Sequence, residues 1–197
     1  MTSTINKITF LVNGISSLLG WNAVLATFDF YNAQYPDGNV YLWFPIPLFL
    51  MYVVIGLLWK EIHQRIPYKY LILIGLLVIN FVMVFLPLIA YYKGHSSAGY
   101  IICLFLCAAI GIFNNVAQLS FFALINFMSL DIVNIFNQGT ALSGLTMVVL
   151  RIIILSIKGT DSNNFGSIII YMVLTIVINT CDIVLNIKFF NSDTYLN

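Results

Sequence analysis

The chain consists of long apolar stretches separated by short polar segments. These stretches lie near residues 8–30, 41–59, 69–92, 98–128, 134–157 and 166–190. Each is long enough for the roughly 20 residues that a helix needs to cross the hydrocarbon core of a bilayer. Their apolar positions do not alternate with polar ones, as the roughly 10-residue strands of a membrane β-barrel would. The pattern predicts an all-α fold, a polytopic bundle of six transmembrane helices that forms a single unit over residues 1–197.

Composition agrees with a location in the lipid bilayer. Of the 197 residues 61% are hydrophobic and 8% are charged, and the mean hydropathy is +0.99. These values lie outside the range of soluble domains. We therefore expect an integral membrane protein of the plasma membrane or an organelle membrane. The net charge of +1 indicates no nucleic-acid partner.

The basic residues favour a cytoplasmic N-terminus, because cytoplasmic loops carry an excess of Lys and Arg. With this orientation the cytoplasmic side holds Lys7, Lys60, Arg65, Lys69 and Lys188, and the outer side holds Lys93 and Lys158. Six spans then return the C-terminus to the cytoplasm as well.

Cysteine and histidine give no sign of catalysis or metal binding. Cys103 and Cys107 lie four residues apart in the fourth span, and Cys181 lies deep in the sixth. This spacing does not suit a metal site, and His63 and His95 fall in loops without a nearby serine and carboxylate. We predict a protein that is not an enzyme and that uses no metal and no cofactor.

Polar side chains inside a span are the most informative residues, since they are costly unless they face a partner or a water-filled cavity. In the first span, Trp21, Leu25 and Asp29 follow one stripe of a helix at about 100° per residue. An outer interfacial belt is an alternative explanation for Asp29. It suits Trp21 less well, because Trp21 lies about 12 Å below the outer end of the span.

The fourth span places several amides on one face. Asn114, Asn115 and Gln118 share this face through their spacings of three and four residues. They predict a hydrogen-bonding wall, and hydrogen bonding between helices is the alternative role for them.

The fifth span carries small residues that lead to a charge. Thr140, Gly144, Met147 and Arg151 follow one face, which predicts a groove ending at an arginine. Gly139, Ser143 and Gly144 also allow close helix contact, and packing is the favoured role for the glycines. At 1.5 Å per residue, Asp182 of the sixth span lies too far toward the cytoplasm to reach Arg151, whereas Asp29 lies within roughly 10 Å in height. We therefore predict an ion pair between Asp29 and Arg151 near an outer gate.

The first span also resembles a known family. The sequence "WNAVLATFDFYNAQYP" at 21–36 resembles the first-helix signature of equilibrative nucleoside transporters, especially the plant and protist members. The similarity extends to "HQRIP" at 63–67 and to "AQLSFF" around Gln118. It continues in "GTALSG" at 139–144 and in "VVLRI", which ends at Arg151 and Ile152.

The resemblance implies transport of nucleosides or nucleobases by alternating access, either facilitated or coupled to protons. It also implies a fold like one half of a major facilitator superfamily transporter, because family members have eleven helices and this chain matches the N-terminal part. By position, the implied substrate-binding residues are Trp21 and Leu25 of the first helix, Tyr52 of the second, Gln118 of the fourth, and Gly139 and Ser143 of the fifth.

The residue chemistry suits such a ligand, which has an aromatic base and a hydroxyl-rich sugar. Trp21 and Tyr52 offer stacking surfaces, and Asn114 and Gln118 offer amide donors and acceptors. Alternating access requires a second bundle of five or six helices, from the same gene, a partner or a second copy. Three alternatives stay open: a membrane subunit that does not transport, a degenerate or truncated half-transporter, and half of a different solute transporter.

Overall fold

The computed structural model describes residues 4–158 and 165–191, and within these ranges the chain is helical apart from short turns. Its long helices are α1 (Thr4–Ala26), α4 (Pro45–Arg65), α5 (Tyr68–Tyr92), α6 (Ser97–Ile125), α7 (Leu130–Lys158) and α8 (Phe165–Phe190). The short helices α2 (Phe28–Gln34), η1 (Pro36–Gly38) and α3 (Val40–Trp43) connect α1 to α4. Within the described ranges, six helices are long and apolar enough to cross a membrane. The all-α fold with six candidate spans is confirmed.

The first predicted span is interrupted in the structure. Thr27 has φ −115° and ψ 13°, outside the helical range, and the chain restarts as α2 at Phe28. The Thr27 hydroxyl donates to the carbonyl oxygens of Ala23 at 2.9 Å and Val24 at 3.1 Å. Such bonds let a threonine compete with the helical hydrogen-bond ladder. The prediction of one continuous helix over 8–30 was therefore wrong at this point, and Asp29 belongs to α2.

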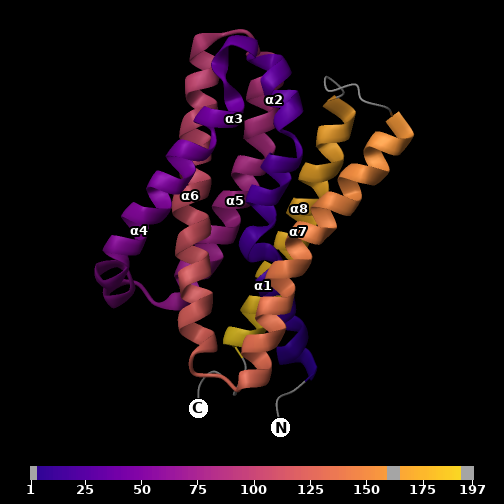
Figure 1. Cartoon of the computed structure of the whole chain (residues 1–197). Helices are drawn as coiled ribbons and strands as arrows, with labels where there is room; N and C mark the ends of the chain where they lie inside the picture. The colour runs from indigo at the N-terminus through magenta and orange to yellow at the C-terminus, as the bar shows by residue number, and fades with distance from the viewer. Residues whose placement is uncertain (1–3, 159–164, 192–197) are drawn as a thin grey trace.

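The six long helices form one bundle in which α4 and α7 lie at opposite edges (Figure 1). α1 packs mainly against α7 and α8, while α6 packs mainly against α5 and α4. α5 and α8 contact each other and join the two groups. α1 begins and α8 ends at the same end of the bundle (Figure 1), as an even number of spans requires. The three terminal residues at the N-terminus and the six at the C-terminus lie outside the described residues.

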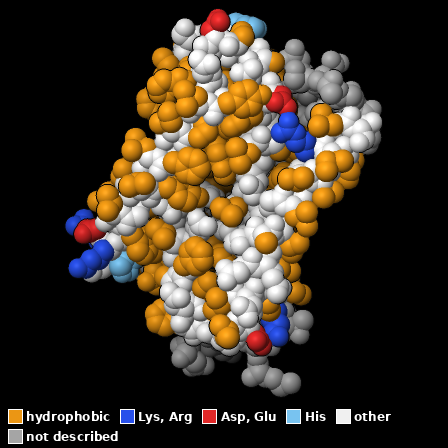
Figure 2. Space-filling model, viewed as in Figure 1, with side chains coloured by type: hydrophobic (Ala, Val, Ile, Leu, Met, Phe, Trp, Pro, Cys, Tyr) orange, Lys and Arg blue, Asp and Glu red, His pale blue; other side chains and the backbone are white. Residues whose placement is uncertain are grey.

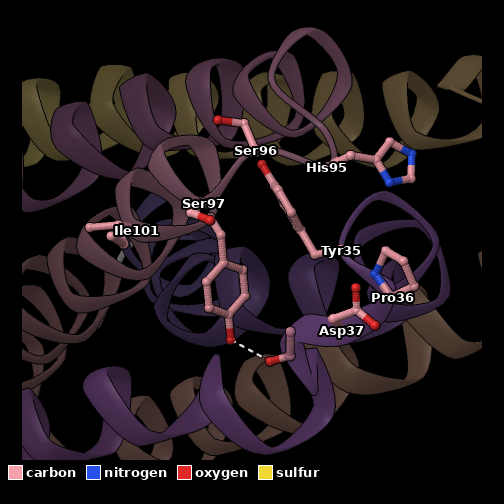
Figure 3. A pocket seen from close by; sticks show the side chains of 9 residues that line it. Tyr35, Pro36, Asp37, His95, Ser96, Ser97 and Ile101 are labelled. Atoms are coloured by element: carbon pink, nitrogen blue, oxygen red, sulfur yellow. Dashed lines mark hydrogen bonds between the residues drawn. The ribbon is translucent and has the colours of Figure 1, made fainter.

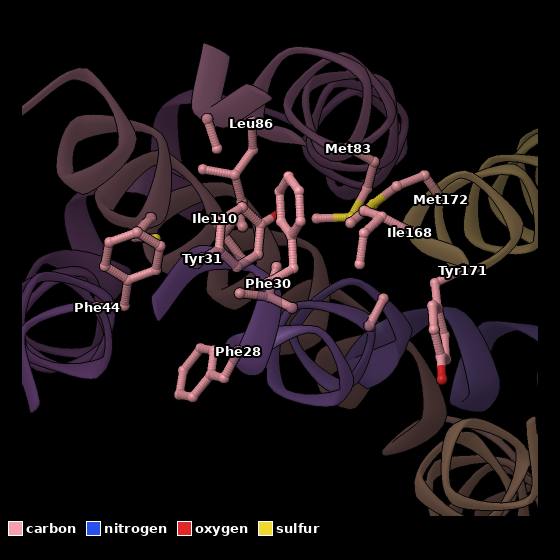
Figure 4. Packing of buried hydrophobic residues seen from close by; sticks show 14 of the residues in the cluster. Phe28, Phe30, Tyr31, Phe44, Met83, Leu86, Ile110, Ile168, Tyr171 and Met172 are labelled. Atoms are coloured by element: carbon pink, nitrogen blue, oxygen red, sulfur yellow. The ribbon is translucent and has the colours of Figure 1, made fainter. Parts of the chain in front are cut away.

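The largest hydrophobic cluster lies between α1, α2, α5, α6 and α8, toward the end that carries α2 and α3. Figure 4 shows Phe30 and Tyr31 of α2 directed into it, toward Leu86, Met83 and Ile110. Both α2 side chains are almost completely buried. The short helix α2 therefore closes this end of the bundle with aromatic rings.

The connection after α2 continues this aromatic packing. Tyr35 is buried, and its ring meets that of Tyr100 with centroids 5.3 Å apart. Burial raises the pKa of the Tyr35 hydroxyl, and its contact with Cys103 Sγ at 3.6 Å acts in the same direction. Asn39 then takes the left-handed conformation at φ 45°, which asparagine tolerates better than most residues. The connection thus packs against the bundle through Tyr35.

The surface of the bundle is largely apolar. Hydrophobic side chains cover much of the middle of the face in Figure 2, whereas charged side chains lie mostly toward its ends, with one neighbouring acidic and basic pair at the upper right. Among the candidate spans, those containing α4 and α7 have the smallest buried share. The two edge helices thus have the most side-chain surface available to lipid or to another bundle.

Candidate functional site

A groove follows the contact between α1 and α7 in the half of the bundle that carries α2. Its volume is about 250 Å³. The lining residues are Asn22, Leu25 and Ala26 of α1 and Gly144, Met147, Val148 and Arg151 of α7. The stripe of small residues that the sequence places along the fifth span therefore borders a real depression, and Arg151 lines it as well.

The two charges predicted to pair are in contact. Arg151 Nη2 donates to Asp29 Oδ2 at 2.5 Å, and this is the one ion pair among the described residues. The side chains are 36% and 45% exposed, respectively. The pair connects α7 to the first turn of α2, immediately after the break at Thr27. Its role as a gate stays a prediction.

Asp29 has a second partner that the sequence did not reveal. Tyr41 of α3 donates its hydroxyl to Asp29 Oδ1 at 2.6 Å. One carboxylate thus joins three helices, α2, α3 and α7. No spacing rule relates Tyr41 to Asp29, because they come together only through the turn at Asn39 that reverses the chain.

Ser143 and Asn22 connect α1 and α7 on the floor of this region. Asn22 Nδ2 donates to Ser143 Oγ at 2.9 Å, and the Ser143 side chain is completely buried. Gly144 beside it leaves space, since an added Cβ would meet only the Asn22 amide, at 3.9 Å. Ser143 therefore fixes the position of Asn22 and does not itself line the groove.

Gly139 lies in the helix crossing and not on a cavity wall. It is buried against Gly14 of α1, and an added Cβ would overlap the carbonyl oxygen of Leu11 and lie 3.0 Å from the Gly14 Cα. A side chain on Gly14 would in turn overlap the carbonyl oxygen of Phe136. Small residues allow two helix backbones this close an approach. Gly139 therefore packs at the helix crossing, as the glycine pattern indicates, and it lines neither pocket, so the substrate contact implied by the resemblance finds no support here.

Trp21 and Leu25 are neighbours on α1 whose side chains contact different helices. Trp21 is half-buried, with its ring against Phe28 at a centroid distance of 5.8 Å and against Phe49 of α4 at 5.9 Å. Leu25 is 38% exposed and lines the groove. The indole thus packs toward α4, whereas Leu25 faces α7. The residues of the single predicted stripe therefore contact two different helices, α4 and α7.

Tyr52 and Asn114 are in contact between α4 and α6. Asn114 Nδ2 donates to the Tyr52 hydroxyl at 2.5 Å, and Asn115 Nδ2 donates to the Tyr52 carbonyl oxygen at 2.7 Å. Asn114 is completely buried, and its Oδ1 has no hydrogen-bond partner among the described residues. The hydrogen-bonding wall and the bonding between helices therefore occur together here. The Asn114 and Asn115 donors join α6 to α4, and Asn114 Oδ1 keeps its acceptor capacity unused among the described residues.

Gln118 differs from these asparagines. It lies one turn after Asn114 on α6 and is half-buried, and no hydrogen bond joins its amide to the described residues. A glutamine amide has two donors and two acceptor lone pairs, and these are costly to leave unused away from water. Gln118 is the predicted substrate residue with the most hydrogen-bonding capacity available.

A second pocket, of about 380 Å³, lies between the connections at the α2 end of the bundle. Tyr35, Pro36, Asp37 and His95 surround it (Figure 3), and Tyr100 donates its hydroxyl to the Gly38 carbonyl oxygen at 2.5 Å beside it. None of the residues singled out from the sequence for substrate binding lines it.

The chain matches no protein-family model, and no curated protein matches it.

Proposed function

We propose that the chain is half of a membrane transporter for nucleosides or nucleobases, which works by alternating access against a second helical bundle. The observation that carries this proposal is the arrangement around α1. On the α4 side of α1 lie the aromatic rings of Trp21 and Phe49, and α6 carries the Gln118 amide, which forms no hydrogen bond with the described residues. On the α7 side lies the groove, which reaches Arg151 of the ion pair. A ligand with an aromatic base and a hydroxyl-rich sugar needs both kinds of surface.

The exposed edges of the bundle support a second half. α4 and α7 flank α1 and α6 and have the smallest buried shares among the candidate spans. In alternating access, two bundles rock against each other around a site near the middle of the membrane. The resemblance of the stretch 21–36 to the first helix of equilibrative nucleoside transporters supplies the substrate class.

Uptake is the direct test. Proteoliposomes that contain the protein are expected to accumulate radiolabelled adenosine or inosine faster than empty liposomes, saturably and with competition from unlabelled nucleosides. Labelled glucose serves as the control solute and should enter both preparations equally. Equal nucleoside uptake by the two preparations, with the protein inserted and monodisperse, would contradict the proposal and favour a membrane subunit that does not transport. Selective glucose uptake would favour a different solute transporter.

Gln118 provides a test at one residue. Gln118→Leu keeps a similar bulk but removes both donor and acceptor atoms, so nucleoside affinity should fall by about 1–3 kcal/mol, or about 5- to 150-fold in Kd. The measurement is the inhibition constant of unlabelled adenosine in the uptake assay. Gln64→Leu, the same change at an exposed position near the end of α4, is the matched control and should leave affinity unchanged. An unchanged affinity in Gln118→Leu would reassign this residue to packing.

A further inference from the structure

Asp182 is a carboxyl group buried far from the ends of its helix. It lies on α8, eight residues or about 12 Å before the helix ends at Phe190, and its exposure is 0%. The side chains around it come from the crossing of α1 and α8: Asn13 and Ser16 of α1 and Asn186 of α8. This cluster is separate from the α1–α7 groove, which none of its members lines.

The amide donors that reach the Asp182 carboxyl group all reach the same oxygen, Oδ1. Asn186 Nδ2 donates to Asp182 Oδ1 at 3.0 Å, to the Asp182 carbonyl oxygen at 2.9 Å and to Asn13 Oδ1 at 2.8 Å. With the nitrogen and oxygen of the Asn13 amide exchanged, its nitrogen lies 2.5 Å from Asp182 Oδ1, in place of the bond from Asn186 to Asn13 Oδ1. Every one of these donors is a neutral amide.

The other carboxyl oxygen has no such support. Asp182 Oδ2 is buried without a hydrogen-bond partner among the described residues, and so are Ser16 Oγ and both amide atoms of Asn179. Asn179 lies three residues before Asp182 and so shares its face of α8, and the Ser16 hydroxyl lies beside the Asp182 carboxyl. Unpaired hydroxyl and amide groups, which include acceptor atoms, therefore adjoin an oxygen that lacks a partner.

No positive charge compensates Asp182 in the part of the chain that the structure describes. Its carboxyl forms no ion pair there, and no titratable side chain of α1, α5, α7 or α8 faces it. The nearest basic residues along α1 and α8 are Lys7, six residues before Asn13, and Lys188, six residues after Asp182. An isolated carboxylate in such surroundings is so unfavourable that the group takes up a proton instead.

We propose that Asp182 is a proton-binding site, at which the folded chain holds a neutral carboxylic acid with its proton on Oδ2. The proton comes from the aqueous phase. The resulting O–H group donates to a neighbouring acceptor, and the Ser16 hydroxyl oxygen lies in position for this role. Oδ1 keeps its amide donors, so both carboxyl oxygens then have partners. The site does not depend on the identity of the transported solute.

Infrared spectroscopy of the purified protein at neutral pH tests the proposal directly. The wild-type spectrum is expected to contain the C=O band of a protonated carboxylic acid, and Asp182→Asn should remove it. Asp29→Asn is the matched control and should remove carboxylate absorption alone, because Asp29 is paired with Arg151. A wild-type spectrum without the carboxylic-acid band would overturn the proposal even if Asp182→Asn failed to fold.

Thermal unfolding at several pH values adds a second readout. A group that binds its proton more tightly in the folded chain stabilises the fold at low pH and loses that contribution as pH rises. Wild-type Tm should therefore fall as the pH rises above about 4, where an ordinary carboxyl of the unfolded chain gives up the proton that the folded chain keeps, whereas Asp182→Asn should lack that component. At about pH 4 the two proteins should unfold within a few degrees of each other, because asparagine matches a neutral acid in shape and polarity, and toward neutral pH the variant should become the more stable of the two. The same pH dependence in both proteins would contradict a proton at Asp182.

Discussion

Gly139→Ala is expected to lower the stability of the bundle by about 2–3 kcal/mol, a large effect for one added methyl group. The methyl group would overlap the carbonyl oxygen of Leu11 and press on the Gly14 Cα at 3.0 Å. Both obstacles are backbone atoms, so no side-chain rotation can make room, and α1 and α7 would have to move apart. That movement would also stretch the Asn22–Ser143 hydrogen bond. Thermal unfolding and the monodisperse fraction in detergent measure the loss.

Gly56→Ala is the matched control for this change. Gly56 lies inside α4, is exposed, and has no heavy atom within 4 Å of an added Cβ. Alanine favours the helix over glycine by roughly 0.5–1 kcal/mol, so this variant should be as stable as the wild type or slightly more stable. If Gly139→Ala behaved like Gly56→Ala, the close crossing of α1 and α7 would be wrong.

The sequence predicted the helices well because a single physical requirement dominates them. A backbone in lipid must satisfy its own hydrogen bonds, so an apolar stretch of sufficient length becomes a helix whatever its details. Five predicted spans, from 41–59 to 166–190, each fall within a candidate span or within a few residues of its bounds. The first failed only at Thr27, where a hydroxyl competes for backbone carbonyls without a proline or glycine to mark the break.

The contacts of each side chain were harder to predict. Helical periodicity shows which side chains share a face of a helix, but not which other helix that face contacts. Trp21 and Leu25 share the predicted stripe, yet one packs toward α4 and the other lines the groove beside α7. For Gly139 the sequence left both packing and a substrate contact open, because only the partner Gly14 on α1 reveals the crossing. Tyr41 and the Asn13–Asn186 contact also depend on how distant segments meet.

The Asp29–Arg151 pair was predictable because charge is rare in these spans. Two opposite charges at similar depth had few other partners, and the structure places them in contact. Its partial exposure limits its contribution, since exposed pairs contribute at most about 1 kcal/mol, whereas breaking a fully buried pair costs about 3–5 kcal/mol. We expect Asp29→Asn or Arg151→Leu to lower stability by about 1–2 kcal/mol, between these limits. Asp37→Asn, at an exposed carboxylate near α2, is the matched control and should have little effect.

The exchange Asp29→Arg with Arg151→Asp separates pairing from two independent roles. If the two side chains stabilise the bundle through each other, the double variant should recover part of the stability and transport that either single change loses. Recovery should be incomplete, because the Tyr41 hydroxyl donates to Asp29 and would face an arginine instead. Thermal unfolding and nucleoside uptake of the three variants measure the coupling. A double variant no better than the worse single variant would mean that the contact does not stabilise the protein, and Asp29 would then act only through Tyr41.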